Sequence, residues 1–390
     1  MPVIESLRAL FRPPRHLVAL FVLVTLFAAL LLLAFGWRLL QQEVKLEEAR
    51  READRVAAAD LLATRLEQAL SATEEVLRDP EAMRLAAVTP DSVTLAISET
   101  QFEVLPHGRL LYYPVPSAGA AAPDEVFAHG EAIESEQKDP RLAAAWFQRL
   151  ARGAPVEVKA GAFVRAARNL RKSGRSDAAL ALYSEAAQLK TTAIDDVPTE
   201  LFARSARCSL LADLQRTSAL RAEAFELREL LLEGRWRVTR PIFEVYLESA
   251  SNWAGAGEPP ANYLIALSEA VHSVWLAQAT APPGSEPADR WVGHRTVIAA
   301  GGFQFTVLSQ RFGARTHILI AGPAYVEDQW KSRIASLEAR HHVQSTLQAP
   351  GQRGSGDVIR RAAPETGLPW TLVVRDASPR NGAREFAAGR

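Results

Sequence analysis

The residues of this chain that could do chemistry are its histidines, its single cysteine and one glycine-rich segment. His341 and His342 are adjacent, but no complete set of carboxylate and imidazole ligands accompanies them at the spacing of a helical or hairpin metal site. We interpret both as surface residues or as the start of a strand. The sequence therefore predicts no metal site at this pair.

The glycine-rich segment GQRGSG, residues 351–356, is not typical of a phosphate-binding loop. No strand leads directly into it and no helix follows in phosphate-binding register, so it is predicted to be a loop. Cys208 is the only cysteine and has no partner for an internal disulfide. It lies in a helical pattern, which predicts a small buried residue rather than a reactive thiol.

Linear catalytic motifs are missing from the sequence. It contains no G-x-S-x-G elbow, P-loop, H-E-x-x-H motif or paired-carboxylate arrangement. We therefore expect no catalytic residues, no metal, no cofactor and no enzymatic activity in this chain. An extracytoplasmic hydrolase is the least favoured of the functions that we considered.

The charge balance bears on the class of partner. Lysine plus arginine and aspartate plus glutamate number 45 each, so the formal net charge is zero. Nucleic-acid-binding proteins carry a net or local basic excess. We therefore expect no nucleic-acid partner.

Residues 17–37, LVALFVLVTLFAALLLLAFGW, contain no charged side chain. As a helix they would be roughly 30 Å long, the thickness of a bilayer's hydrocarbon core, and a helix satisfies its own backbone hydrogen bonds in lipid. A cleaved secretory signal is the alternative, but it would have a shorter apolar run followed by a small-x-small cleavage site. We predict a retained transmembrane helix over 17–38, so the lipid bilayer is one expected partner.

The flanking charges predict the orientation of this helix. Arg8, Arg12 and Arg15 precede it with Glu5 as the only acid, whereas glutamates soon follow it. Because positive residues favour the cytoplasmic side, the tail 1–16 is expected inside and everything after about residue 40 outside. No later apolar run is long enough for a second span, so a single membrane pass is predicted.

Residues 39–79 have the pattern of one long helical stalk. Small or apolar residues recur three or four apart at Leu46, Ala49, Ala53, Val56, Ala59, Ala63, Leu66, Leu70 and Leu77. Such a stripe suits a partner helix, for example the same helix in a homodimer, and it equally suits packing on the chain's own domain. Both alternatives stay open at this stage.

The remaining pattern predicts an α+β, mostly helical fold in which a helical block interrupts one mixed α/β domain. Strands are predicted at 92–98, 100–106, 109–115, 303–310, 316–322, 343–348 and 370–376, and a helix at 324–340. The expected boundaries are 80–123 and 291–377 for the two parts of the domain, 124–280 for the helical insertion, 281–290 for a proline-rich linker, and 378–390 for the start of an exit helix.

One segment of the helical block, GAFVRAARNLRKSGRSDAALALYSEAAQL (161–189), resembles a tetratricopeptide repeat. Ala166, Ala167 and Leu170 share a face of the first helix, Gly174 makes the turn, and Tyr183 lies between small residues on the second. A lone repeat cannot bury its face, so we expect a short stack of about three helical hairpins.

The layout of span, stalk and external α/β domain resembles the input half of a bacterial transmembrane sensor histidine kinase. HGRLLYYPV resembles the hairpin of PAS- or Cache-like sensor domains. GLPWTLVVRDASP resembles the last strand of such a domain, which leads through a short helix into a second span. The helical block resembles an insertion found in some of these sensors.

The kinase half that this resemblance implies is absent. No phosphoacceptor H-E-x-x-x-P box and no asparagine- or glycine-rich ATP-binding box is present, and His342 in HHVQSTLQ lacks the neighbouring acid and proline. We therefore expect a sensor region of a two-component system that lacks its kinase core, anchored in the bacterial inner membrane with its bulk in the periplasm. Its ligand would be an unknown extracytoplasmic molecule or protein.

A ligand pocket in the α/β domain would draw on aromatic residues and one arginine. The candidate residues are Tyr112, Tyr113, Phe305, Arg315, Tyr325 and Trp330. Arg315 would pair with an anionic ligand and the aromatics would line the walls. The alternative is that the aromatics are core residues and that Arg315 is a solvated loop residue. The alternative function for the whole chain is a membrane-anchored tetratricopeptide-like scaffold for protein–protein interactions in the cell envelope.

Overall fold

The structure is a computed structural model that describes residues 15–79, 81, 83, 89–98, 102–115, 119–257, 262–279, 294–312, 315–351 and 358–377. Several predicted segments lie wholly or largely outside the described residues. They are the cytoplasmic tail 1–16, the linker 281–290, the loop 351–356 and the exit helix 378–390.

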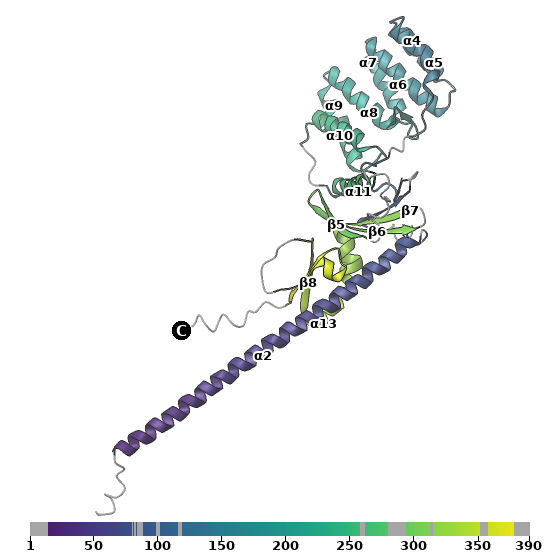
Figure 1. Cartoon of the computed structure of the whole chain (residues 1–390). Helices are drawn as coiled ribbons and strands as arrows, with labels where there is room; N and C mark the ends of the chain where they lie inside the picture. Colours follow the sequence, from purple (N-terminus) through teal and green to yellow (C-terminus); the bar gives the residue numbers. More distant parts are fainter. Residues whose placement is uncertain are drawn as a thin grey trace, which may run out of the picture.

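The predicted span and stalk form one continuous helix, α2 (Arg15–Arg78). Its 64 residues make a rod of about 96 Å at the α-helical rise of 1.5 Å per residue. In Figure 1 this rod extends far beyond the rest of the protein. Among the described residues, α2 is the one helix long and apolar enough to cross a membrane, with a mean hydropathy of 2.6 in its most apolar window. We call the described residues from 81 to 377 the body.

The centre of the body is a five-stranded antiparallel sheet of β1 (Ser92–Ile97), β2 (Phe102–Leu105), β5 (Arg295–Ala300), β6 (Phe303–Phe312) and β7 (Arg315–Ala321). The strand order is β2-β1-β7-β6-β5. The pairing of β1 with β7 places Val93 opposite Ile320 and Leu95 opposite Ile318. Strands on both sides of the helical block in sequence therefore share one sheet.

Alternation along the strands gives this sheet two apolar faces, and each packs on a helix. Phe305, Val307 and Ile318 contribute to a core with α11 (Tyr263–Ala279). Leu308 and Leu319 contribute to a second core with α2. The sheet thus lies between α11 and the C-terminal part of α2, because period-two patterning gives it two apolar faces that can both be buried.

A three-stranded antiparallel sheet also packs against α2, on the side of the central sheet that carries Leu308 and Leu319. Its order is β8-β10-β9, formed by β8 (Val343–Gln348), β9 (Ile359–Arg361) and β10 (Thr371–Asp376). The predicted helix 324–340 is helical but irregular. It consists of α12 (Pro323–Tyr325), the π-helical turn η2 (Val326–Trp330), the 3-10 turn η3 (Lys331–Ile334) and α13 (Ala335–His341). His342 follows in a left-handed conformation and precedes β8, in agreement with the strand-start interpretation of the histidine pair.

The helical block is a series of antiparallel neighbours at the end of the body far from the exposed end of α2 (Figure 1). It comprises η1 (Asp124–Val126), α4 (Ala128–Ser135), α5 (Pro140–Leu150), α6 (Val156–Lys172), α7 (Ser176–Ala186), a short hairpin of β3 (Ala193–Ile194) and β4 (Val197–Pro198), α8 (Thr199–Asp213), α9 (Thr217–Leu232) and α10 (Arg240–Ala254). The helix pair predicted at 161–189 is confirmed as α6 and α7. Ala166, Leu170 and Tyr183 are buried between them, and Gly174 turns the chain at a φ of +77°.

The predicted strand 109–115 is wrong. Leu110 and Tyr113 are buried on the sheet side, whereas Leu111 and Tyr112 are buried against the helical block. Two N–H groups of the segment donate outside any sheet, that of Leu111 to Ser268 Oγ at 2.9 Å and that of Tyr113 to the Val238 carbonyl at 2.8 Å. The segment is therefore an irregular connection between two cores, whose four consecutive buried side chains are incompatible with a one-faced strand.

Candidate functional site at the junction of α2 and the body

The C-terminal part of α2 is a structural element of the body. Its buried apolar residues are Ala58, Ala59, Leu62, Ala63, Leu66, Ala69, Leu70 and Leu77. They occupy one stripe at three- and four-residue spacing, which is the face a helix uses to pack on a core. Of the two alternatives for the predicted stripe, packing on the chain's own body holds from about Ala58 onward. We call this contact zone, residues 58–78 of α2 with their partners, the junction.

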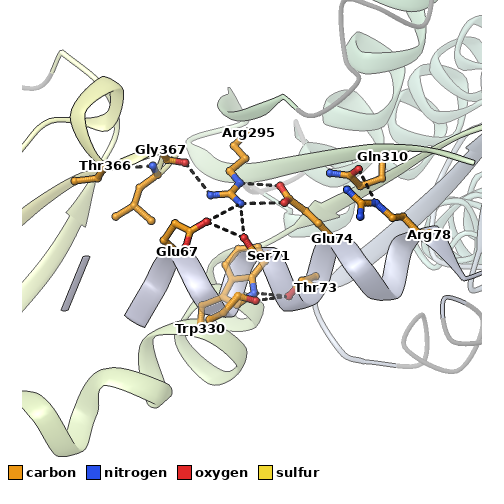
Figure 2. A network of polar contacts seen from close by, with 12 residues as sticks. Glu67, Ser71, Thr73, Glu74, Arg78, Arg295, Gln310, Trp330, Thr366 and Gly367 are labelled. Atoms are coloured by element: carbon orange, nitrogen blue, oxygen red, sulfur yellow. Dashed lines mark hydrogen bonds and ion pairs between the residues drawn. The ribbon is translucent and has the colours of Figure 1, made fainter. Parts of the chain in front are cut away.

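Arg295, the first residue of β5, holds α2 to the central sheet through several hydrogen bonds (Figure 2). Its Nε lies 2.7 Å from Glu74 Oε1, and its Nη2 lies 2.9 Å from Glu74 Oε2 and 2.9 Å from Ser71 Oγ. This is a bidentate arginine–carboxylate pair, a strong and directional form of hydrogen bonding. The hydrogen bond with Glu74, which outweighs the opposing effect of burial, raises the pKa of Arg295, so the guanidinium stays charged.

The same arginine also reaches the second sheet. Its Nη1 donates to the carbonyl of Gly367 at 3.0 Å, in the turn that leads into β10. One side chain thus connects α2, β5 and the β10 turn. Since Arg295 and Glu74 are 14% and 11% exposed, the pair is largely removed from solvent.

The C-terminal end of α2 is fixed by the central strands. His317 on β7 is buried, and its Nδ1 lies 2.7 Å from the Leu77 carbonyl oxygen. A carbonyl can only accept a hydrogen bond, so Nδ1 carries the proton. Arg78 Nε donates to Gln310 Oε1 at 3.3 Å. The His317 bond satisfies one of the last carbonyls of α2, which have no partner within the helix, and the Arg78 bond adds a side-chain contact to β6.

Two tryptophans in contact, Trp370 and Trp330, connect the sheets to the junction, and we call them the tryptophan row. Trp370 Nε1 donates to Thr306 Oγ1 on β6 at 3.0 Å, and its ring centre lies 5.5 Å from that of Trp330. Trp330, the last residue of η2, donates through its Nε1 to Thr73 Oγ1 of α2 at 3.0 Å (Figure 2). A continuous series of hydrogen bonds and ring contacts therefore connects β6 to α2.

Two ion pairs lie at and just beyond the N-terminal end of the junction on α2. Arg361 of β9 donates through Nε to Asp60 Oδ1 at 2.5 Å, and Arg55 lies 3.9 Å from Asp376 at the end of β10. Because β10 begins near Trp370, which packs through Trp330 against Thr73, and ends beside Arg55, it runs antiparallel to α2. The last described strand therefore points toward the exposed, apolar part of the helix.

A second contact connects α11 to the junction. The carboxylate of Asp91, just before β1, accepts from the N–H of Ala324 at 2.6 Å at the start of the irregular helix. Tyr263 at the start of α11 lies against the same carboxylate, and burial together with Asp91 raises the pKa of Tyr263. A side chain at Gly322 would overlap both groups, which explains the glycine there. α11 and the helix that carries Trp330 thus meet at one carboxylate.

The structure distributes the six predicted ligand residues over several environments. Tyr325 and Trp330 lie together in the core with α2, with ring centres 5.2 Å apart. Phe305 and Tyr113 belong to the core with α11, and Tyr112 lies in the helical block, where its hydroxyl donates to Glu269 Oε2 at 2.8 Å. Arg315 is exposed at the start of β7. The five aromatics are buried core residues, and the six do not line one cavity.

Other predicted features of the chain are also located. Cys208 is fully buried, and burial together with the nearby Glu223 raises the pKa of its thiol to about 12, so it fits the expected inert role. Within the described part of the chain, no group of three histidine, cysteine or acidic side chains could hold a metal. The residues that sequence reasoning missed are Arg295, Glu74, Thr73 and Trp370. Arg295 meets Glu74, and Thr73 meets Trp330, across more than 200 residues of sequence.

No protein-family model matches the chain, and comparisons with curated proteins and with solved structures find no match. The geometry of the junction is therefore the basis on which a function can be assigned.

Proposed function

We propose that this protein is the extracytoplasmic signal-input region of a membrane-anchored sensor of the histidine-kinase type. A ligand or partner protein would act on the body, and the body would act on the membrane helix. The single observation that supports this best is that α2 is shared. Residues 58–78 contribute to the body's core, and the predicted span 17–38 is part of the same unbroken helix.

A shared helix supports signal transfer for a physical reason. A rearrangement in the body that moves the side chains around Arg295, Trp330 or His317 must move α2 or lose their hydrogen bonds. Allosteric coupling requires such an element, whose position is biased by events at another site. The Asp91 contact connects α11, which packs against the helical block through Leu264 and Ile265, to the same helix.

The location that we propose is the bacterial inner membrane, with the tail in the cytoplasm and the body in the periplasm. The basic residues before the span and the acidic ones after it support this orientation. We further propose that the protein is a homodimer paired along the exposed part of the stalk. Leu46 is 59% exposed there, and Ala49 and Ala53 on the same stripe are also exposed.

The test uses the full chain with a DNA-binding reporter domain fused ahead of Met1. The reporter activates transcription only as a dimer and only if the N-terminus is cytoplasmic. Thr73→Val removes the acceptor of Trp330 Nε1 while keeping the shape of the side chain. We expect an altered reporter output at equal membrane level.

Thr64→Val is the matched control, because the hydroxyl of Thr64 bonds only the carbonyl of Asp60 within α2, at 2.9 Å. It should leave the output unchanged. Equal output from wild type and Thr73→Val, or a silent reporter in every variant, would contradict the signalling proposal.

The second candidate function is a membrane-anchored scaffold. It is favoured by a groove of about 400 Å³ in the helical block, lined by Ser184, Gln188, Arg204, Arg207, Glu223 and Glu226. The charges of this groove suit a protein partner, and the helices α7 to α9 that line it belong to the block at the end of the body far from the exposed end of α2 (Figure 1). A scaffold would lose partner capture on Glu223→Lys or Glu226→Lys, and its reporter output would be indifferent to Thr73→Val.

A further inference from the structure

A second groove lies between the start of β6, the π-helical turn η2 and the strand β8 at the edge of the small sheet. Its volume is about 430 Å³, within the range of small-molecule sites, roughly 300–1,000 Å³. Its apolar lining consists of Phe303, Pro323, Val326, Leu347 and Trp370. An apolar cavity of this size with a few polar groups is the usual composition of a ligand site.

One ion pair lies in this groove, and one of its two side chains is much more exposed to solvent than the other. Lys331 Nζ lies 2.9 Å from Glu327 Oε1, and their side chains are 26% and 62% exposed. Exposed pairs of this kind contribute only about 0–1 kcal/mol. An anion that enters the groove can therefore replace Glu327 beside Lys331, because Glu327 is free to turn back to water.

The groove borders the tryptophan row. Trp370 lines it, and the Thr306 hydroxyl, which accepts from Trp370 Nε1, keeps its own hydrogen as a donor. η2, which forms another wall, is a π-helical turn, and such turns are rare and occur frequently at functional sites. Its last residue, Trp330, is the one that contacts Thr73 of α2.

We propose that this groove binds a small aromatic anion, with the ring against Leu347 and Trp370 and the acidic group on Lys331. The purpose of such binding rests on the proposed function, since the ligand would act on α2 through Trp370 and Trp330. The binding itself does not depend on that function and can be measured separately.

The test is calorimetric titration of the full chain in lipid nanodiscs with 2-naphthoate, after subtraction of the heat from empty nanodiscs. We expect one saturable site per chain. Lys331→Met keeps the apolar stem and removes the charge, so it should weaken binding about tenfold or more, in line with loss of a charge-assisted hydrogen bond. The neutral 2-naphthamide should bind wild type and Lys331→Met equally.

Two further variants complete the design. Leu347→Trp should fill the groove and abolish binding, and Lys190→Met, an exposed lysine of the helical block, should change nothing. If circular dichroism shows that Leu347→Trp is unfolded, Lys331→Met decides, because Lys331 is partly exposed and its loss leaves no buried gap.

The proposal is overturned if 2-naphthoate gives no saturable heat up to about 10 mM, above the Kd of even millimolar sites, or if Lys331→Met binds as wild type does. Saturable binding with an unchanged reporter output would instead contradict the signalling function and leave the groove assignment intact. The two failures are therefore distinguishable.

Discussion

The two halves of α2 belong to one helix and have opposite surroundings. In the first half, Phe21 is 70% exposed and Leu32 is 74% exposed, whereas Leu62, Leu66 and Leu70 in the second half are fully buried by the body. Both halves contain many apolar residues, so the number of apolar residues does not distinguish the two halves. The arrangement differs, because apolar side chains surround the helix in the first half and form one stripe in the second.

This difference shows how one helix can serve two solvents. A helix that is apolar on every side belongs in lipid, and one with a single stripe belongs on a protein core. Between them lie about 17 residues from Arg38 to Asp54, rich in charge and exposed throughout. Equivalent substitutions in the exposed part of the stalk, before residue 58, and in the junction should therefore have very different effects on stability.

The largest difference is expected for arginine. Arg295→Met leaves the buried Glu74 carboxylate without its main partner, and loss of one member of a buried pair destabilises by about 3–5 kcal/mol. Arg51→Met removes a stalk pair with Glu47, in which both side chains are more than 60% exposed, and should change stability by less than about 1 kcal/mol. Urea unfolding of the full chain in detergent, followed by tryptophan fluorescence, measures both.

The double variant Arg295→Met with Glu74→Leu provides the control for this prediction. It removes the unpaired charge and should recover much of the lost stability. If the double variant is as unstable as the single one, the effect of Arg295 lies in its contacts with Ser71 and Gly367 and not in the ion pair.

The next largest difference is expected for leucine. Leu66→Ala opens a cavity in the core with α2 and should reduce the free energy of unfolding by about 2–5 kcal/mol. Leu46→Ala, at a position that is 59% exposed, should stay within about 0.5 kcal/mol of wild type in a monomeric preparation. A clearly destabilising Leu46→Ala at high protein concentration only would instead reveal pairing of two stalks.

A smaller effect is expected for a single hydrogen bond. Thr73→Val leaves Trp330 Nε1 buried without an acceptor and should destabilise by about 1–3 kcal/mol. Thr64→Val, on an exposed face of α2, should change stability by less than about 0.5 kcal/mol. Equal midpoints for these two variants in urea unfolding would show that the tryptophan row does not hold α2.

The smallest effect is expected at the boundary between the halves. The hydrogen bond from Arg361 lowers the pKa of Asp60 below its ordinary value of 3.8. A lowered folded-state pKa contributes stability that is present above pH 3.8 and is lost as the pH falls through the folded-state value. Asp60→Asn should therefore destabilise by less than about 1 kcal/mol at pH 7, and its difference from wild type should shrink as the pH falls below 3.8, as thermal unfolding between pH 7 and pH 2 would show.

Local patterns predicted most of the elements. The uninterrupted α2 and the strands β1, β2, β6, β7, β8 and β10 follow from hydrophobic periodicity and β-branched residues. β5 and the three-residue β9 were not predicted, because Arg295–Ala300 is only partly buried and Ile359–Arg361 is mostly charged. The segment 109–115 has strand-forming residues, but two separate cores determine its conformation.

The candidate site was much less predictable than the fold. Aromatic residues are abundant both in pockets and in cores, and the composition around Tyr112, Phe305 or Trp330 does not distinguish the two. The Arg295–Glu74 pair joins residues 221 positions apart, and neither residue has a local pattern that indicates the other. Only the strand pairing that folds β5 back over α2 brings these charges together.

Because α2 is long, a small rotation of the helix at the junction produces a larger displacement at its far end. From Leu66 in the junction to residue 17 at the membrane end there are 49 residues, or about 75 Å of rigid helix. A rotation of about 5° at the junction would sweep the far end of such a lever through roughly 6 Å, more than one helical pitch. If α2 spans a membrane as we propose, a change in side-chain packing around Arg295 too slight to alter the shape of the body would reach the bilayer as a displacement that lipids must accommodate.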